Sequence, residues 1–247
     1  MDIIRVKNYQ TMSEKACGYL VDKIQAAQKP VLGLATGSTP EGLYKQLIEK
    51  YQEGAVSFKD VSTFNLDEYV GLERKDPNSY HYYMNEKLFK HVDLSIENVH
   101  LPNGAAGDLQ QECRDYEASI KQAGDVDVQI LGLGLNGHIG FNEPGTPFSS
   151  RTHVVDLDES TREANARFFE SKADVPTQAI TMGIESIMES KEIVLLVSGA
   201  KKAEALARLI NGEISEDFPA SVLKQHPQVT IIADEEACVH IREHVHS

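Results

Sequence analysis

The stretch Val31-Leu-Gly-Leu-Ala-Thr-Gly-Ser-Thr-Pro40 passes from a nearly continuous apolar run to small polar residues and a proline. The run Val31–Ala35 does not alternate between apolar and polar residues, which is typical of a strand covered on both faces. Pro40 suits the first turn of a helix, where a backbone N–H is not needed. The stretch therefore predicts a buried strand, a tight loop and a helix over Glu41–Tyr51.

The same alternation of strand and helix signals continues along the chain. Further apolar runs cover Val61–Leu66, Val126–Leu133, Ile193–Val197 and Val229–Ala233. Helices are predicted from a capping box at Thr11–Glu14 to about Gln28, from a Ser79 cap to about Phe89, over Asp108–Gln122, from near Thr161, and over Ala200–Asn211 before Gly212. This order predicts an α/β fold with a doubly wound, mainly parallel sheet and helices on both faces. Without a linker or repeat, residues 1–247 are expected to form a single domain.

Composition and charge exclude several classes of protein. The chain has 24 basic and 38 acidic residues and a formal net charge of −14, which argues against nucleic acid or an anionic membrane as the main partner. Cys17, Cys113 and Cys238 form no CxxC pair, so a reducing compartment is expected. No signal peptide is visible, and the apolar runs are far shorter than the ~20 residues of a membrane span. We therefore expect a soluble, cytoplasmic protein.

The loop after the first apolar run has the features of an anion site. Thr36, Gly37, Ser38 and Thr39 lie between a predicted strand and a helix N-terminus. Free backbone N–H groups and the positive end of the helix then face the same point, which favours a simple phosphate. The alternative is an ordinary helix cap made by Ser or Thr.

Two adjacent acids, Asp67 and Glu68, follow the run Val61–Leu66. Ligands of parallel α/β sheets bind beyond the carboxyl ends of the strands. A carboxylate at that place suits a general base or a metal ligand. The alternative is a solvated carboxylate in a loop.

The segment Leu131-Gly-Leu-Gly-Leu-Asn-Gly-His-Ile-Gly-Phe-Asn-Glu-Pro-Gly145 contains glycines in GxGxxG spacing. A dinucleotide site would need a helix to begin here, but Gly140 and Pro144 interrupt the chain. What remains is a glycine-rich loop with His138 and Glu143. An imidazole exchanges protons near neutral pH, and Glu143 could orient it across the turn. The alternative is a structural histidine.

Several cationic or metal-binding residues are candidates as well. Lys201 and Lys202 open a predicted helix, where an anionic ligand would offset the unfavourable charge, and Arg167 lies on the helix from near Thr161. All three can equally be surface charges. His240 and His244 fit the HxxEH pattern of zinc peptidases, but only three residues follow them, so a third ligand would have to come from elsewhere, and no metal site is predicted.

Four segments together resemble the glucosamine-6-phosphate deaminase family. They are Leu34-Ala-Thr-Gly-Ser-Thr-Pro40, Thr63-Phe-Asn-Leu-Asp-Glu-Tyr-Val-Gly71, Gly137-His-Ile-Gly-Phe-Asn-Glu-Pro144 and Ser150-Arg-Thr152, and the resemblance runs from about Ile3 to Asp234. It implies a Rossmann-like sheet, no organic cofactor and no metal. It also implies conversion of D-glucosamine 6-phosphate and water to D-fructose 6-phosphate and ammonia, a step of amino-sugar catabolism.

The resemblance also implies catalytic roles. His138 opens the pyranose ring, Glu143 positions and charges His138, and Asp67 moves a proton from C2 to C1. Many family members carry an acid two residues before this histidine, where Asn136 stands here. An amide carries no charge, so Glu143 is expected to supply the negative charge.

The substrate implied by the resemblance is a small sugar phosphate. Its phosphate is expected on Thr36–Thr39, with Arg167 and Lys202 as cationic clamps. Allosterically activated members carry Arg and Lys where this chain has His153 and Val155. We therefore expect a non-allosteric enzyme that is a monomer or a small homo-oligomer.

Three other functions compete with this interpretation. A 6-phosphogluconolactonase-like hydrolase would share the fold but lack the Asn142-Glu143-Pro144 continuation. A sugar-phosphate-sensing domain typically loses catalytic residues and carries a DNA-binding module. An NAD-dependent oxidoreductase would need a helix directly after the glycines.

Overall fold

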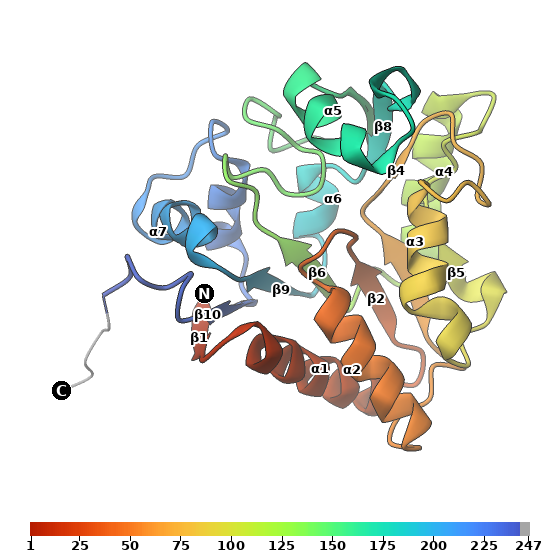
Figure 1. The fold of residues 1–247 in the computed structure, drawn as a ribbon. Coiled ribbons are helices and arrows are strands. Elements are labelled where there is room, and N and C mark those ends of the chain that lie inside the picture. Colours follow the sequence, from red (N-terminus) through yellow and green to blue (C-terminus); the bar gives the residue numbers. More distant parts are fainter. Residues whose placement is uncertain (243–247) are drawn as a thin grey trace.

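A computed structural model describes residues 1–242 of the chain. Within them, seven strands form one sheet in which all neighbours are parallel, in the order β1-β10-β9-β6-β2-β3-β5 (Figure 1). The strands are β1 (Asp2–Val6), β2 (Val31–Leu34), β3 (Ser62–Asn65), β5 (Val99–His100), β6 (Val128–Gly132), β9 (Glu192–Val197) and β10 (Val229–Asp234). The predicted Rossmann-like α/β fold is confirmed.

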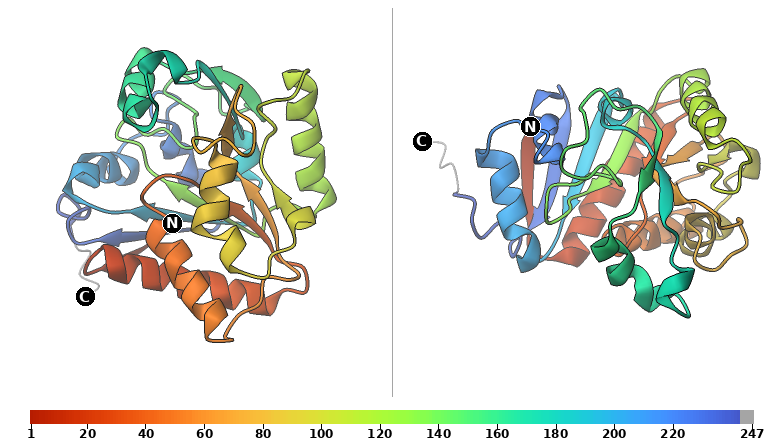
Figure 2. Two further views of the ribbon diagram at one scale, coloured as in Figure 1. Left: turned by 45° about the vertical axis from the view of Figure 1, so that its right-hand side comes forward. Right: turned by 90° about the horizontal axis from the view of Figure 1, so that it is seen from above.

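Helices cover both faces of this sheet (Figures 1 and 2). The buried sides of α1 (Tyr9–Ala26), α2 (Glu41–Gln52) and α3 (Tyr80–Lys87) pack in one apolar cluster. Those of α4 (Leu109–Gln122), α6 (Ile184–Met188) and α7 (Ala203–Asn211) pack in a second cluster. Successive residues of β9 from Ile193 to Val197 alternate between the two clusters, which explains why this run is continuously apolar.

The order of the strands places a crevice between β2 and β6. From β2 the chain proceeds to β3 and β5 on one side, and from β6 it proceeds to β9 and β10 on the other. The loops that follow β2 and β6 therefore run to opposite sides, although the two strands are neighbours in the sheet. Open α/β sheets bind ligands at such a reversal of strand order.

A second sheet was not predicted. Among the described residues, β4 (Asp67–Tyr69), β8 (Gln178–Thr181) and β7 (His153–Asp156) form an antiparallel sheet in the order β4-β8-β7. It lies at the top of Figure 1, next to α5 (Glu159–Asn165). The Asp67–Tyr69 segment is therefore a strand rather than the end of a loop. Its three residues are too few and too polar to give a strand signal.

Several helix boundaries differ from the prediction. Helix α1 begins at Tyr9, because the side chain of Asn8 caps it by accepting a hydrogen bond of 2.9 Å from the Thr11 amide. The predicted capping box at Thr11 is therefore wrong. The predicted caps at Ser79 and Asp108 are confirmed, since each side chain accepts a hydrogen bond from an amide of the first turn.

The cationic candidates lie in short 3₁₀ turns rather than in α-helices. Lys201 and Lys202 belong to the turn Ala200–Lys202 that precedes α7, and Arg167 belongs to the turn Ala166–Phe168 that follows α5. Helix α5 buries none of its residues, so packing does not extend it to Arg167.

Between β10 and residue 242 the chain forms no helix, so the described part of the HxxEH pattern is not helical. Residues 235–240, including His240, form turns. Glu243 and His244 lie outside the described residues. No helix within residues 1–242 has the length and apolar character needed to cross a membrane.

Gly33 shows how tightly the centre of the main sheet is packed. A Cβ atom at this position would lie 2.1 Å from Oε1 of Gln129, whose side chain crosses the glycine from the neighbouring strand. The Gln129 side chain is fully buried and donates a 2.9 Å hydrogen bond to the Ile130 carbonyl, so it has little freedom to move. A side chain at position 33 is therefore excluded.

Substitution of two glycines tests this packing. Gly33→Ala should lower the free energy of unfolding by about 1–3 kcal/mol, because the new methyl group overpacks the sheet. Gly18→Ala is the matched control: Gly18 lies in α1, is exposed, and has open space around an added Cβ. It should raise the free energy of unfolding by about 0.5–1 kcal/mol. Denaturant unfolding measures both, and equal effects of the two variants would contradict this account.

Candidate active site

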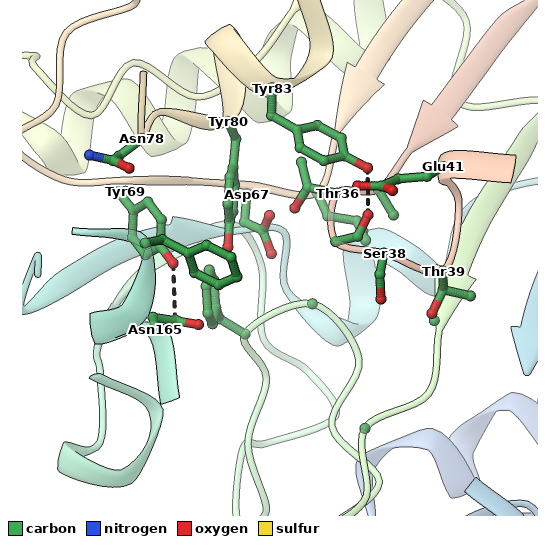
Figure 3. Close-up of a pocket in the computed structure, with 18 of the residues that line it drawn as sticks. Thr36, Ser38, Thr39, Glu41, Asp67, Tyr69, Asn78, Tyr80, Tyr83 and Asn165 are labelled. Carbon is green, nitrogen blue, oxygen red and sulfur yellow. Dashed lines mark hydrogen bonds between the residues drawn. The ribbon is translucent and has the colours of Figure 1, made fainter. Parts of the chain in front are cut away.

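A cavity of about 710 Å³ opens at the carboxyl ends of β2 and β6 (Figure 3). Eight of the ten predicted site residues line it: Thr36, Gly37, Ser38, Thr39, Asp67, His138, Arg167 and Lys202. Asn136 and Glu143 are not among its lining residues. Segments more than 160 residues apart in the sequence thus meet in one cavity.

The loop after β2 presents main-chain N–H groups to this cavity. Within residues 1–242, the amides of Thr36, Gly37, Ser38 and Thr39 have no hydrogen-bond acceptor. Gly37 has a φ of +88°, in the left-handed region that favours glycine. Helix α2 begins directly afterwards at Glu41, so its positive end faces the same loop. Such an arrangement binds an anion.

Two cationic side chains border the same cavity. Lys202 is partly buried and donates a 2.5 Å hydrogen bond to the Leu133 carbonyl, and burial lowers the pKa of its ammonium group. Arg167 is exposed, and its guanidinium lies 4.6 Å from the centre of the Phe168 ring. Neither forms an ion pair with a carboxylate in the described part of the chain. Both charges are therefore available to an anionic ligand.

One carboxylate, Glu41, also borders the cavity near the loop (Figure 3). Its charge opposes an anion, but Lys87 lies 3.7 Å from it. The balance of charge around the loop remains in favour of an anion, because the free amides and two cations face one partly compensated acid.

The two adjacent acids have different environments. The Glu68 carboxylate accepts hydrogen bonds of 2.9–3.0 Å from the amides of Tyr69, Tyr80 and His81, and so holds the first turn of α3 against β4. The Asp67 side chain is 7% exposed and makes no hydrogen bond within residues 1–242. Burial, and then the charge of Glu68, raise the pKa of Asp67 to about 8. Asp67 therefore keeps its proton to a higher pH than an ordinary aspartate does.

Glu68 shares the effect of burial but keeps its charge more readily. Burial raises the pKa of Glu68 to about 6, while the three amide hydrogen bonds act to lower it. The negative charge of the pair therefore resides on Glu68 and the proton on Asp67 near neutral pH. This division leaves Asp67 as the acid that can exchange a proton with a ligand.

The glycine-rich loop fixes one tautomer of His138. Its Nδ1 lies 2.9 Å from the Gly140 carbonyl oxygen, which can only accept a hydrogen bond. Nδ1 therefore carries the proton, and Nε2 of the neutral ring keeps a lone pair. A Cβ at Gly134 would lie 2.0 Å from Cδ2 of the ring, so this glycine makes room for the imidazole.

Glu143 does not hold the imidazole directly, as the sequence had suggested. Its Oε2 accepts a 2.8 Å hydrogen bond from the Asn136 amide group, and Oδ1 of Asn136 accepts one of 3.1 Å from the His138 backbone N–H. The carbonyl of Gly140 orients the ring instead. Asn136 suits this chain of contacts because an amide donates and accepts at once, which an ionised acid cannot do.

An aromatic wall, which was not predicted from the sequence, lines one side of the cavity. The ring of Tyr69 lies 4.7 Å from that of Tyr80 and 6.0 Å from that of Phe141, measured between centroids. The Asn165 side chain donates a 3.0 Å hydrogen bond to the Tyr69 hydroxyl (Figure 3). The aromatic residues next to Asp67 and His138 in the sequence could have indicated this wall, but aromatic residues are more often part of a hydrophobic core.

Within residues 1–242, no group of three or more His, Cys, Asp or Glu side chains is arranged to hold a metal ion.

Known proteins resemble the chain over nearly its whole length. The profile of the family described as glucosamine-6-phosphate isomerases/6-phosphogluconolactonase matches residues 7–232. A protein of Oceanobacillus iheyensis named glucosamine-6-phosphate deaminase is 62% identical over 99% of this chain and 98% of its own. One of the same name from Shouchella clausii is 61% identical over 96% of each chain.

Solved structures agree with this likeness. One described as a monomeric glucosamine-6-phosphate deaminase is 52% identical, with a TM-score of 0.94 over 97% of this chain and 100% of that one. The 6-phosphogluconolactonase of Thermotoga maritima is 20% identical, with a TM-score of 0.75 over 95% of this chain and 99% of that one. This second likeness shows a common fold only.

The raised pKa of Asp67 predicts a dependence of stability on pH. Between the ordinary carboxyl pKa of about 4 and about 8, the folded state holds a proton that the unfolded chain has released. Folding is therefore favoured at the acidic end of this window, and the contribution of Asp67 to stability falls as pH rises to 8. Asp67→Asn removes the ionisation and should be more stable than the parent at pH 8 by about 2–5 kcal/mol, at about 1.4 kcal/mol per pKa unit.

This gain should shrink towards pH 4, where Asp67 is neutral in both states. Asp60→Asn is the control, since Asp60 is an exposed aspartate. Thermal or denaturant unfolding at several pH values measures both variants. A gain for Asp67→Asn that does not change with pH would show that burial of the ionised carboxylate has no cost.

Proposed function

Because the chain belongs to the family of glucosamine-6-phosphate isomerases and 6-phosphogluconolactonases, we propose that it is a glucosamine-6-phosphate deaminase. The reaction converts D-glucosamine 6-phosphate and water to D-fructose 6-phosphate and ammonia. The observation that carries the proposal is that three kinds of group share one cavity. They are the buried Asp67 carboxyl, which has no hydrogen-bond partner in residues 1–242, the free Nε2 of His138, and the amides of Thr36–Thr39. Relatives with this name are 62% and 61% identical.

The phosphate group of the substrate would occupy the Thr36–Thr39 loop. The free amides of the loop donate to its oxygens, and Lys202 and Arg167, which line the same cavity, supply positive charge. Fixing the phosphate orients the sugar so that C1 and C2 lie towards the interior of the cavity, where Asp67 is buried. This positioning is the main contribution of the loop to the rate.

His138 would act in the ring-opening step. Its neutral Nε2 takes the proton of the C1 hydroxyl, and the imidazolium then returns a proton to the ring oxygen as the C1–O5 bond breaks. The Gly140 carbonyl holds Nδ1–H throughout, so the same nitrogen serves both transfers. The product of this step is the open-chain aldehyde.

Asp67 would act in the isomerisation step. As a carboxylate it takes the proton from C2, the substrate's ammonium group gives one proton to the aldehyde oxygen, and a neutral enolamine forms. The Asp67 carboxyl then returns its proton to C1, which leaves an iminium group at C2. Water adds to this group, and ammonia leaves as the C2 carbonyl forms. A substrate ammonium group entering the cavity favours the ionised form of Asp67 that the first step requires.

We place this reaction in the cytoplasm, in a monomer or small homo-oligomer without allosteric activation. The three cysteines are all buried free thiols, which fits a reducing compartment. A similar solved deaminase is described as monomeric. His153 and Val155 stand at the two positions where activated members carry basic residues. The net charge of −14 disfavours nucleic acid as a partner.

An ammonia-release assay tests the proposed function. Glucosamine 6-phosphate should yield ammonia and fructose 6-phosphate in equal amounts, whereas unphosphorylated glucosamine should react far less. Hydrolysis of 6-phosphogluconolactone is the second comparison. Ready hydrolysis of the lactone without release of ammonia from the amino sugar would identify a lactonase instead.

Asp67→Asn should lower turnover by about 10²–10⁴-fold, because the C2 proton then has no base. Exchange of the C2 proton in deuterated water separates this step from ring opening and should fall by the same factor. Circular dichroism confirms that the variant is folded. Exchange at the parental rate would remove Asp67 from the isomerisation step.

Lys202→Ala and Arg167→Ala should each raise KM and the inhibition constant of inorganic phosphate by roughly ten- to a hundredfold, since a charge-assisted hydrogen bond contributes about 1.5–3 kcal/mol. Lys201→Ala is the matched control, because Lys201 is the adjacent lysine and does not line the cavity. If Lys201→Ala weakens phosphate binding as much as Lys202→Ala does, the loss comes from the lower positive charge of the region. Direct binding of the phosphate by Lys202 would then be wrong.

A further inference from the structure

Three tyrosine hydroxyls from three helices hold the carbonyl groups of the Ala35–Thr39 loop. Tyr44 of α2 donates to the Ala35 carbonyl and accepts a 3.1 Å hydrogen bond from the Ala35 amide. Tyr83 of α3 donates to the Gly37 carbonyl at 2.5 Å (Figure 3). Tyr9 of α1 lies 2.9 Å from the Ser38 carbonyl oxygen and 3.0 Å from that of Thr39. The sequence analysis gave none of these tyrosines a role.

These contacts fix the direction of the loop amides. In a trans peptide the C=O and the N–H of the following residue point in opposite directions. A carbonyl of Gly37 directed at Tyr83 therefore turns the Ser38 N–H away from Tyr83, and a carbonyl of Ser38 directed at Tyr9 turns the Thr39 N–H away from Tyr9. The amides turned in this way are those without an acceptor in residues 1–242.

Tyr83 acts at the point where the loop most needs support. Gly37 has the left-handed φ of +88°, and glycine has more conformational freedom to lose than any other residue. The Tyr83 hydroxyl binds the carbonyl of this glycine. Burial, and then the neighbouring Tyr44, Glu41 and Tyr9, raise the pKa of Tyr83 well above its ordinary value, so the hydroxyl remains a donor. Its single proton is committed to Gly37 and is not free for a ligand.

Tyr9 ties the loop to the start of α2. Its hydroxyl accepts a 2.8 Å hydrogen bond from the Gly42 amide in the first turn of α2 while it faces the carbonyls of Ser38 and Thr39. Tyr9 is 36% exposed, so its ring contributes little to the core. Its hydroxyl is therefore the group whose loss can be measured without a large change in packing.

We propose that Tyr9 and Tyr83 are positioning residues for the phosphate group: their hydroxyls hold the Ala35–Thr39 loop with its amides directed at the ligand before it binds. The inference rests on the proposed function, because it assumes that the loop binds the phosphate of the substrate. Without the two hydroxyls the loop would have to be ordered by the ligand, and that ordering would reduce affinity. Tyr44 is fully buried and serves the core as well.

The test uses the full chain with Tyr9→Phe, Tyr83→Phe and the double variant, which remove only hydroxyl groups. Tyr82→Phe is the matched control: Tyr82 lies in α3 beside Tyr83, is exposed, and its hydroxyl has no partner within residues 1–242. Binding of inorganic phosphate, measured by calorimetry, gives affinity without turnover. Steady-state assays with glucosamine 6-phosphate give KM and kcat separately, and thermal unfolding reports stability.

Each single variant should weaken phosphate binding and raise KM by about three- to tenfold, with kcat changed by less than about twofold. The double variant should lose more affinity than either, and Tyr82→Phe should behave as the parent. The proposal is overturned if the double variant binds phosphate within twofold of the parent, if kcat falls while KM is unchanged, or if the parent chain binds no phosphate.

Failure of the proposed function has a different signature. A parent chain that binds phosphate but releases no ammonia from glucosamine 6-phosphate contradicts the deaminase assignment, whereas the calorimetric comparison of the variants still decides the role of the tyrosines. Loss of stability in Tyr9→Phe or Tyr83→Phe beyond that of Tyr82→Phe, without loss of phosphate affinity, would assign the hydroxyls to folding and overturn the proposal.

Discussion

The site depends on one residue, Leu66, that lies between β3 and β4 and links the two sheets through its backbone. The Leu66 N–H donates to the Leu34 carbonyl of the parallel sheet, and the Leu66 carbonyl accepts from the Met182 amide beside the antiparallel sheet. With its two backbone groups committed in this way, the chain has to deliver the next residue, Asp67, to the junction of the sheets. The carboxyl is buried there, and burial rather than a hydrogen-bonded partner within residues 1–242 is the main cause of its raised pKa.

The short strand β4 organises the cavity through two adjacent carboxyl groups. Asp67 faces the cavity, while the next carboxylate, Glu68, captures the first turn of α3 through backbone amides. Helix α3 in turn carries Tyr83 to the loop after β2. Asp67 and Glu68 look equivalent in the sequence but differ in the structure. Backbone N–H groups bind the Glu68 carboxylate, whereas the Asp67 carboxyl accepts no hydrogen bond within residues 1–242.

The fold was predictable because its strands are apolar runs that alternate with amphipathic helices, and the site loops follow those strands directly. The second sheet was not predictable, since Asp67–Tyr69 is short and polar and its partner β8 lies more than 100 residues further along the chain. The contacts of Glu143 and the orientation of His138 depend on the path of a glycine-rich loop, which sequence spacing does not determine. Tyr9 and Tyr83 look like ordinary helix residues until the helices pack against the loop.

The neutral Asp67 carboxyl has a consequence for selection among sugars of the same shape. If the Asp67 carboxyl keeps its raised pKa until a cation enters, the uptake of an amino sugar exchanges one positive charge, the proton, for another. A hexose phosphate without an amino group brings no such cation and leaves the proton in place. In the proposed mechanism, binding of the amino group therefore ionises the carboxyl that removes the C2 proton, whereas a sugar without the nitrogen leaves that carboxyl protonated.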